Sequence, residues 1–327
     1  EQADATAWMG FYCLTMLDIA LELALHDDAY EGVASKFFEH FVAIADAMNE
    51  MGADGLWDEQ DGFYYDQIQT PRGAVTLRIR SLVGLIPLCA VGVIPDEALT
   101  RLPRFRKRME WFLEHRQDLR DHVSCMDACE DGSGRRLLAV PNRHRLERML
   151  TRLLDEGEFL SPYGIRSLSR AHRDHPFTLT LDGRDECVRY APGEAESGMF
   201  GGNSNWRGPV WLPLNYLLIE SLRTYHSFYG ESFRAECPVG SQHPLTLAGV
   251  ADELARRLTR LFLPDGEGRR PCHGSEARYA RDPHFRDLVL FYEYFHGDTG
   301  RGCGAAHQTG WTALVASLLR EGPSPQV

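Results

Sequence analysis

The sequence predicts an all-helical fold that carries unusually long loops. Apolar residues recur at steps of three and four over most of the chain, which is the period of amphipathic helices. Strand signals are confined to two short tracts, FYY at residues 63–65 and VRY at residues 188–190, and no series of alternating strands and helices is present. Residues 161–205 show little helical period over roughly 45 positions, far beyond a usual connection of about 4–6 residues, and their aromatic and arginine content favours a functional loop.

The apolar period predicts about eight helices in chain order. The first two, at residues 7–25 and 30–51, are expected to form an antiparallel hairpin joined by HDDA. The others are expected at residues 78–91, 105–116, 143–156, 206–229, 247–262 and 308–319. No flexible linker interrupts them, so residues 1–327 are expected to form a single domain.

Composition and charge exclude several classes of partner. The apolar run at residues 82–95 contains two prolines and is shorter than the roughly 20 residues that cross a bilayer, so no membrane span is expected. The net charge of −12 disfavours nucleic acid and anionic membrane surfaces, which are usually met by lysine and arginine. A neutral oligosaccharide or small glycoside is compatible with this charge, although an acidic composition alone also suits an ordinary soluble protein.

Eight cysteines are scattered without CxxC pairs or Cys/His clusters. This pattern favours reduced, mostly buried thiols in a cytoplasmic protein, and it gives no metal site. No phosphate-binding or dinucleotide-binding motif is present either, so no cofactor is expected.

Three loop motifs combine aromatic, amide and charged residues: LWDEQDGFYYD at 56–66, FGGNSNWRGPVWLPLN at 200–215, and FYEYFHGDTGRGCGAAHQTGWT at 291–312. Sugars present an apolar face and a rim of hydroxyls, so a sugar pocket needs flat aromatic surfaces beside hydrogen-bonding side chains. The three loops are therefore predicted to gather around a sugar site, together with Tyr163 from the long loop.

In the second motif, glycines precede Trp206, Arg207 and Trp211 at the start of a predicted helix. The first two are predicted to edge the pocket. For Trp211 a place in the hydrophobic core is an equally good interpretation, and Asn215 should share its helix face.

In the third motif, Glu293 lies between two tyrosines, a setting that suits a partly desolvated general base. Asp298 is its local competitor, but Asp before Thr-Gly is a common turn residue. His307, Gln308 and Trp311 are predicted to bind substrate at the start of the last helix.

In the first motif, the three aspartates lack the ligand spacing of a calcium loop. A tight Asp61-Gly62 turn between short strands is the better interpretation, with Trp57 lining the cavity.

Together these motifs resemble the catalytic domain of glycoside hydrolase family 63, which includes processing α-glucosidases and relatives acting on mannosylglycerate-type compounds. The resemblance rests on EQADATAWM, WDEQDGFYYD, EFLSPYGIRSLSR, GGNSNWRGPVWLPLNYLLIESL and YEYFHGDTGRGCGAAHQTGWT, in that order. It implies an (α/α)6 toroid and hydrolysis of an α-glycosidic bond with inversion, with Glu293 as the general base. The family's acid is an aspartate before the helix at 7–25, so the toroid is expected to be incomplete at its N-terminus and to lack the acid.

The leading hypothesis is an inverting α-glycosidase, and the alternative is a sugar-binding fragment or pseudoenzyme that has lost its acid. A helical-repeat scaffold is disfavoured because no repeat period is found. An incomplete toroid should also expose apolar surface, and the helix at 7–25 is bulky and apolar around most of its circumference.

Overall fold

The computed structural model describes residues 3–50, 55–70, 73–115, 124–128, 133–181, 183–194 and 207–321. The chain divides into two compact units. The first comprises residues 1–78, 83–150 and 223–233, and the second comprises residues 79–82, 151–222 and 234–327. The expectation of a single domain stays a prediction, and each unit is described by itself.

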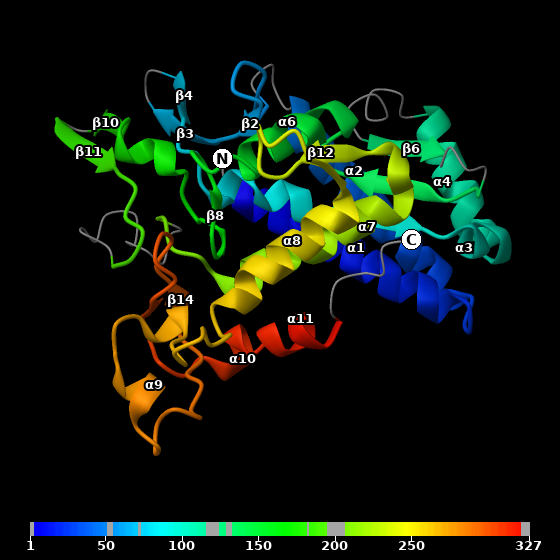
Figure 1. Ribbon diagram of the computed structural model, residues 1–327. Helices are drawn as coiled ribbons and strands as arrows, with labels where there is room; N and C mark the ends of the chain where they lie inside the picture. The colour runs from blue at the N-terminus through cyan, green and yellow to red at the C-terminus, as the bar shows by residue number, and fades with distance from the viewer. Residues whose placement is uncertain are drawn as a thin grey trace. The chain divides into compact units, whose positions relative to one another are not determined.

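A helical hairpin forms the largest part of the first unit. Helices α1 (Ala3–Ala24) and α2 (Ala29–Glu50) pack along each other (Figure 1), joined by a short turn at residues 25–28. Phe38, Phe41 and Met48 of α2 are fully buried. The first two predicted helices and their hairpin arrangement are therefore confirmed.

One face of α1 carries an exposed apolar stripe. Its side chains recur at steps of three and four and are each at least 39% exposed: Met9, Tyr12, Met16, Ile19 and Leu23. This agrees with the expectation of exposed apolar surface on this helix. Residues 5–24 also form a helix long and apolar enough to cross a membrane by length and composition, a test that core helices of soluble proteins pass as well.

Short strand pairs complete the first unit. Strand β1 (Trp57–Asp58) pairs with β2 (Phe63–Tyr64), and β3 (Asp66–Thr70) pairs with β4 (Gly73–Leu77). Strands β5 (Val91–Ile94), β6 (Ser124–Ala128) and β7 (Arg136–Ala139) form one sheet in the order β5-β7-β6. The other helices of this unit include α3 (Asp96–Arg101), α4 (Pro103–His115) and most of α6 (Arg143–Leu153), and residues 223–233 add the end of a helix that begins in the second unit.

The predicted helix at residues 78–91 is wrong. Only two 3-10 turns form there, η2 (Leu82–Gly84) and η3 (Ile86–Cys89). Pro87 removes a backbone donor, and a Cβ on Gly84 would lie 2.2 Å from the Tyr64 carbonyl oxygen. Close packing of buried residues, rather than helix formation, shapes this apolar segment.

The second unit combines two helices with strand hairpins. Helix α7 (Leu212–Tyr229) contributes its first part to this unit, and α8 (Leu247–Arg260) lies wholly within it. The hairpins pair β8 (Leu160–Ser161) with β9 (Gly164–Ile165), β10 (Phe177–Leu181) with β11 (Arg184–Val188), β12 (Arg234–Glu236) with β13 (Pro244–Thr246), and β14 (Tyr294–Phe295) with β15 (Gly302–Cys303). Short helical elements complete it: η4 (Arg170–Arg173), η7 (Pro271–His273), α9 (Arg278–Arg281), α10 (Thr309–Thr312) and α11 (Val315–Glu321).

The all-α toroid expected from the sequence is therefore wrong. The described residues contain helices together with seven small antiparallel sheets, six of two strands and one of three. All of these strands have only two to five residues, too few to show clearly the alternation by which strands are recognised in a sequence. The pairing of these strands depends on tight turns and on contacts between distant loops. Neither can be predicted from the helical spacing of apolar residues.

Candidate active site

An extended segment around Val210 joins two of the sequence motifs in the second unit. Its backbone exchanges hydrogen bonds of 2.8 and 2.9 Å with Phe295, and on its other side it bridges to Arg166. Just before it, the Gly208 N–H donates to Ser167 Oγ at 2.7 Å. The RGPVW part of the second motif and the YEYF part of the third motif are thus adjacent.

Glu293 precedes β14 and is half-buried. Its N–H donates to the Ala305 carbonyl at 2.9 Å, and its Oε2 accepts from the Ala305 N–H at 3.1 Å. Gly304 adopts φ +67°, and a Cβ there would lie 2.6 Å from the same Oε2. Among the described residues, no cation forms an ion pair with this carboxylate. Glu293 is therefore held by the backbone of Ala305, and no described cation neutralises its charge.

An aromatic cluster lies next to Glu293. The ring of Trp211 is 4.8 Å from that of Tyr294 and 6.0 Å from that of Trp311. Trp211 is only 4% exposed, whereas Trp311 is 38% exposed. The Tyr294 hydroxyl donates to Glu194 at 3.1 Å, and burial together with this carboxylate raises the pKa of Tyr294. Trp311 is thus partly accessible, and it packs edge to face against the buried ring of Trp211.

The other substrate-binding candidates of the third motif are exposed. Phe291 bridges to His307, and the Gln308 N–H donates to the Phe291 carbonyl at 2.7 Å. Helix α10 starts directly after Gln308 and ends at Thr312, where a break separates it from α11. The single last helix expected at residues 308–319 is therefore two short helices.

Arg207 is buried, with 5% of its surface exposed, and burial lowers the pKa of its guanidinium. It directly precedes Gly208, whose φ of +114° brings the backbone against the Ala191 carbonyl. Trp206 lies outside the described residues, so its predicted role stays a prediction.

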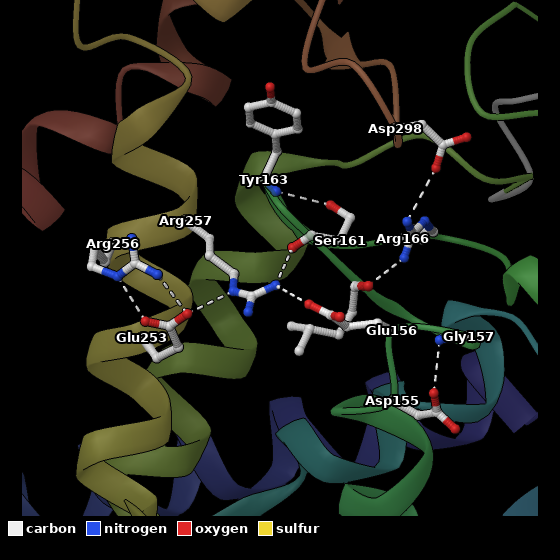
Figure 2. A network of polar contacts seen from close by, with 11 residues as sticks. Asp155, Glu156, Gly157, Ser161, Tyr163, Arg166, Glu253, Arg256, Arg257 and Asp298 are labelled. Carbon is white, nitrogen blue, oxygen red and sulfur yellow. Dashed lines mark hydrogen bonds and ion pairs between the residues drawn. The ribbon is translucent and has the colours of Figure 1, made fainter. Parts of the chain in front are cut away.

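The β8–β9 hairpin presents Tyr163 at its turn. On α8, Arg257 donates to the Ser161 carbonyl at 2.8 Å and pairs with Glu253 at 2.7 Å. Figure 2 shows this network at the base of the hairpin, with the Tyr163 side chain pointing away from it. From α7, Asn215 accepts from the Ile165 N–H at 2.6 Å and donates to the Ile165 carbonyl at 3.0 Å. Two helices therefore fix the hairpin that carries the tyrosine.

Gly164, beside this tyrosine, adopts φ +124°. A Cβ there would lie 2.8 Å from Asn215 Oδ1 and 2.9 Å from a Leu258 methyl group. Only glycine fits this position, because both the conformation and the space exclude a side chain.

A network that sequence reasoning missed anchors the third motif. Arg166 is 3% exposed, pairs with Asp298 at 3.1 Å, and donates from Nε to the Tyr190 hydroxyl at 2.9 Å. That hydroxyl donates to the same Asp298 oxygen at 2.9 Å. Asp298 is thus neutralised by a buried arginine, which separates its role from that of Glu293. An arginine among apolar and serine residues in GIRSLS was the only signal for it.

His296 shapes the turn that contains Asp298. Its Nδ1 accepts from the N–H groups of Asp298 and Thr299, both at 3.2 Å. Burial lowers the pKa of His296, which favours the neutral ring that these acceptor contacts need. The turn predicted at HGDTG is confirmed, and its internal support is this imidazole.

Trp57 belongs to the first unit, whereas Glu293 belongs to the second. Trp57 is 8% exposed, and its ring packs edge-on against Tyr64 at 4.9 Å and under the guanidinium groups of Arg145 and Arg148 at 5.0 and 5.7 Å. The predicted turn between short strands is confirmed, with Gly62 at φ +65°. The gathering of all three loops stays a prediction.

Comparison with known proteins gives a consistent classification. The family model described as mannosylglycerate hydrolase MGH1-like glycoside hydrolase domain matches residues 136–312. An uncharacterized protein of Saccharomyces cerevisiae is 49% identical over 98% of this chain and 31% of its own length. The mannosyl-oligosaccharide glucosidase of the same yeast is 26% identical over 56% of this chain and 16% of its own length. A probable mannosyl-oligosaccharide glucosidase of Schizosaccharomyces pombe is 27% identical over 54% of this chain and 15% of its own length.

This chain therefore spans less than a third of the length of these curated relatives. Among solved structures, a sialidase is similar over 95% of this chain and 18% of its own, with a TM-score of 0.45 and 12% sequence identity.

Proposed function

We propose that this chain, which belongs to the family of MGH1-like glycoside hydrolases, supplies the general base of an inverting α-glycosidase. The base is Glu293. In such a reaction a carboxylate takes a proton from water while a carboxylic acid protonates the leaving oxygen. The observation that carries the proposal is a half-buried carboxylate with no ion-pairing cation among the described residues, beside the aromatic cluster of Trp211, Tyr294 and Trp311.

The substrate we propose is an α-glucoside or a related α-glycoside of an oligosaccharide. Two relatives are named mannosyl-oligosaccharide glucosidases, which supports a glucosidic bond. The exposed ring face of Trp311 suits the C–H face of a sugar, and the neighbouring His307 and Gln308 offer hydrogen bonds to hydroxyls.

An inverting site needs a second carboxyl group roughly 6.5–9.5 Å from the base. Within the described residues, the carboxylates around the third motif are already engaged, since Asp298 pairs with Arg166 and Glu194 accepts from Tyr294. We therefore propose that the acid lies outside the residues that the structure describes.

The test is Glu293→Gln in the complete protein. Glutamine keeps the shape and the contact with the Ala305 N–H but takes no proton from water, so kcat should fall by about 10²–10⁴-fold while the melting temperature holds. Glu194→Gln is the matched control, because glutamine still accepts from the Tyr294 hydroxyl. It should leave kcat within a few-fold of its starting value.

Proton NMR of the first product formed would show whether the anomeric configuration is inverted. Near-normal turnover in Glu293→Gln would refute the base assignment. Sugar binding without turnover in the unmodified complete protein would instead support a sugar-binding role, the alternative drawn from the sequence.

A further inference from the structure

A large cleft of about 1390 Å³ lies in the second unit, beside the third motif but apart from Glu293. Its walls come from the C-terminal end of α8, from residues 263–281, and from the loop at residues 296–301. Tyr163 lines it, whereas Glu293, Trp211 and Trp311 do not. The function proposed above therefore leaves this cleft without a role.

The cleft is cationic in a chain whose net charge is −12. Its described lining has five arginines against three carboxylates. Each of these carboxylates already has a cationic partner. Arg269 pairs with Asp265 at 3.0 Å and with Glu267 at 3.3 Å, and Arg278 lies 4.0 Å from Glu276.

Four of the five lining arginines have no carboxylate partner among the described residues. Three of them are exposed: Arg260, Arg281 and Arg301. A fourth, Arg270, is held by backbone carbonyls, to Phe262 at 3.1 Å and to Arg286 at 3.0 Å. Its guanidinium is fixed in position while its charge remains uncompensated. Arginine in this state is suited to planar, charge-assisted recognition of phosphate or carboxylate.

His273 is the second, independent sign of a ligand. It lines the cleft, is 6% exposed, and neither ring nitrogen has a hydrogen-bond partner within the described part of the chain. Its ring packs against that of Tyr279, with the centroids 4.2 Å apart and the planes tilted by 33°, which restricts its orientation. Buried polar atoms are normally satisfied, so an unpaired imidazole at the wall of a cleft points to a partner that occupies the cleft.

We propose that this cleft binds an anionic sugar, with the phosphate monoester or carboxylate held by Arg260, Arg281 and His273 and the ring against Tyr163. The anionic part of this proposal stands on the arginines and the imidazole alone. The sugar part rests on the proposed function, because the Tyr163 face suits a sugar only if the protein acts on sugars.

Calorimetric titration of the complete protein tests this with four probes: glucose 6-phosphate, glucuronate, glucose and inorganic phosphate. Comparing glucose 6-phosphate with glucuronate shows whether the cleft prefers a phosphate monoester or a carboxylate. We expect one of the two anionic sugars to bind at least tenfold more tightly than both glucose and inorganic phosphate. Arg260→Ala and Arg281→Ala should each weaken that binding by about tenfold, as expected for the loss of one charge-assisted hydrogen bond.

Arg320→Ala is the matched control, since Arg320 lies on α11 outside the cleft. It should leave the dissociation constant unchanged. His273→Phe keeps an aromatic ring against Tyr279 but removes both ring nitrogens. It should therefore weaken binding of the anionic sugar without lowering the melting temperature.

Two results would overturn the proposal: no anionic sugar binds more tightly than glucose, or binding persists unchanged in the two arginine variants. Inorganic phosphate binding as tightly as the sugar phosphate would refute its sugar part. Because binding is measured without turnover, a failure here is distinct from a failure of the Glu293 assignment.

Discussion

The first and third motif loops have similar compositions, but the aspartates of the first and Glu293 of the third are held differently. In the first, Asp58 and Asp61 both pair with Arg78, at 2.7 and 3.1 Å. In the third, the carboxylate of Glu293 accepts a hydrogen bond only from the N–H of Ala305 among the described residues. A neutralised carboxylate stabilises a fold, whereas one without a cation is available to take a proton. Composition alone therefore does not show which loop leaves a carboxylate without a cationic partner.

The largest difference between the two loops is expected in how much each tryptophan contributes to the stability of the protein. Trp57 is buried, packs on Tyr64 and lies under two arginines, so Trp57→Ala should destabilise the protein by about 3–5 kcal/mol. Trp311 is 38% exposed, so Trp311→Ala should cost under about 1 kcal/mol but weaken sugar binding. Urea unfolding and sugar titration of both variants measure the difference. Equal losses of stability in the two variants would contradict the conclusion that Trp57 is structural and Trp311 is not.

A methyl group placed at two glycines of similar backbone conformation, one beside Glu293 and one away from it, separates strain from chemistry. Gly304 and Gly268 adopt φ +67° and +77°, so alanine at either should cost about 1–2 kcal/mol. Only at position 304 would the new Cβ press on the Glu293 carboxylate, 2.6 Å away, while at 268 the nearest atom is 3.6 Å away. Turnover should therefore fall in Gly304→Ala and hold in Gly268→Ala. A similar kcat in the two variants, measured well below their melting temperatures, would contradict the placement of Glu293.

Much of the local structure was predictable from the sequence, but the long-range pairs that distinguish the two loops were not. The residues of HGDTG and the Asp61-Gly62 pair predicted turns correctly, and the periods of α1, α2 and α8 predicted helices correctly. The pairing of Asp298 with Arg166 joins residues 132 positions apart, which no local pattern reports. The cationic cleft was missed for the same reason, because Tyr163 and the arginines reach it from three separate segments.

A smaller effect is expected from the ion pair of the first loop. Asp58→Asn keeps the acceptor for the Asp61 N–H at 2.8 Å but loses the pair with Arg78, whose side chain is 48% exposed. Such a pair contributes about 0.2–1 kcal/mol, so stability should fall by that amount and the difference should shrink in high salt. Turnover should not change. A large loss of turnover would mean that the first loop, too, carries chemistry.

The smallest expected effect is a pH dependence of the turn in the third loop. The first loop should not show it, because residues 56–66 contain no histidine. Burial lowers the pKa of His296, helped by Arg301 and opposed by Asp298. The folded state therefore favours the neutral ring, so His296 contributes to the stability of the fold at pH values above about 6.5, the pKa of a histidine in the unfolded chain. This contribution to stability is lost as the pH falls from there through the lowered pKa of the folded state.

The protection factors of the N–H groups of Asp298 and Thr299, which correct the exchange rates for the intrinsic slowing of exchange towards acid pH, should therefore be lower at pH 5 than at pH 7.5. His296→Asn supplies an acceptor that does not titrate, so it should remove this extra pH dependence. Unchanged protection in the parent across this range would show that the imidazole does not support the turn.

The β8–β9 hairpin has a consequence for protein engineering. Its base is fixed by Asn215, Arg257 and the glycine at 164, so those positions tolerate little exchange. Its tip carries a half-buried tyrosine that lines the cleft, and the side chain of this tyrosine takes no part in the hydrogen bonds that hold the base of the hairpin. A library randomised at residue 163 alone should therefore consist largely of folded proteins, in which ligand preference varies while the scaffold stays constant.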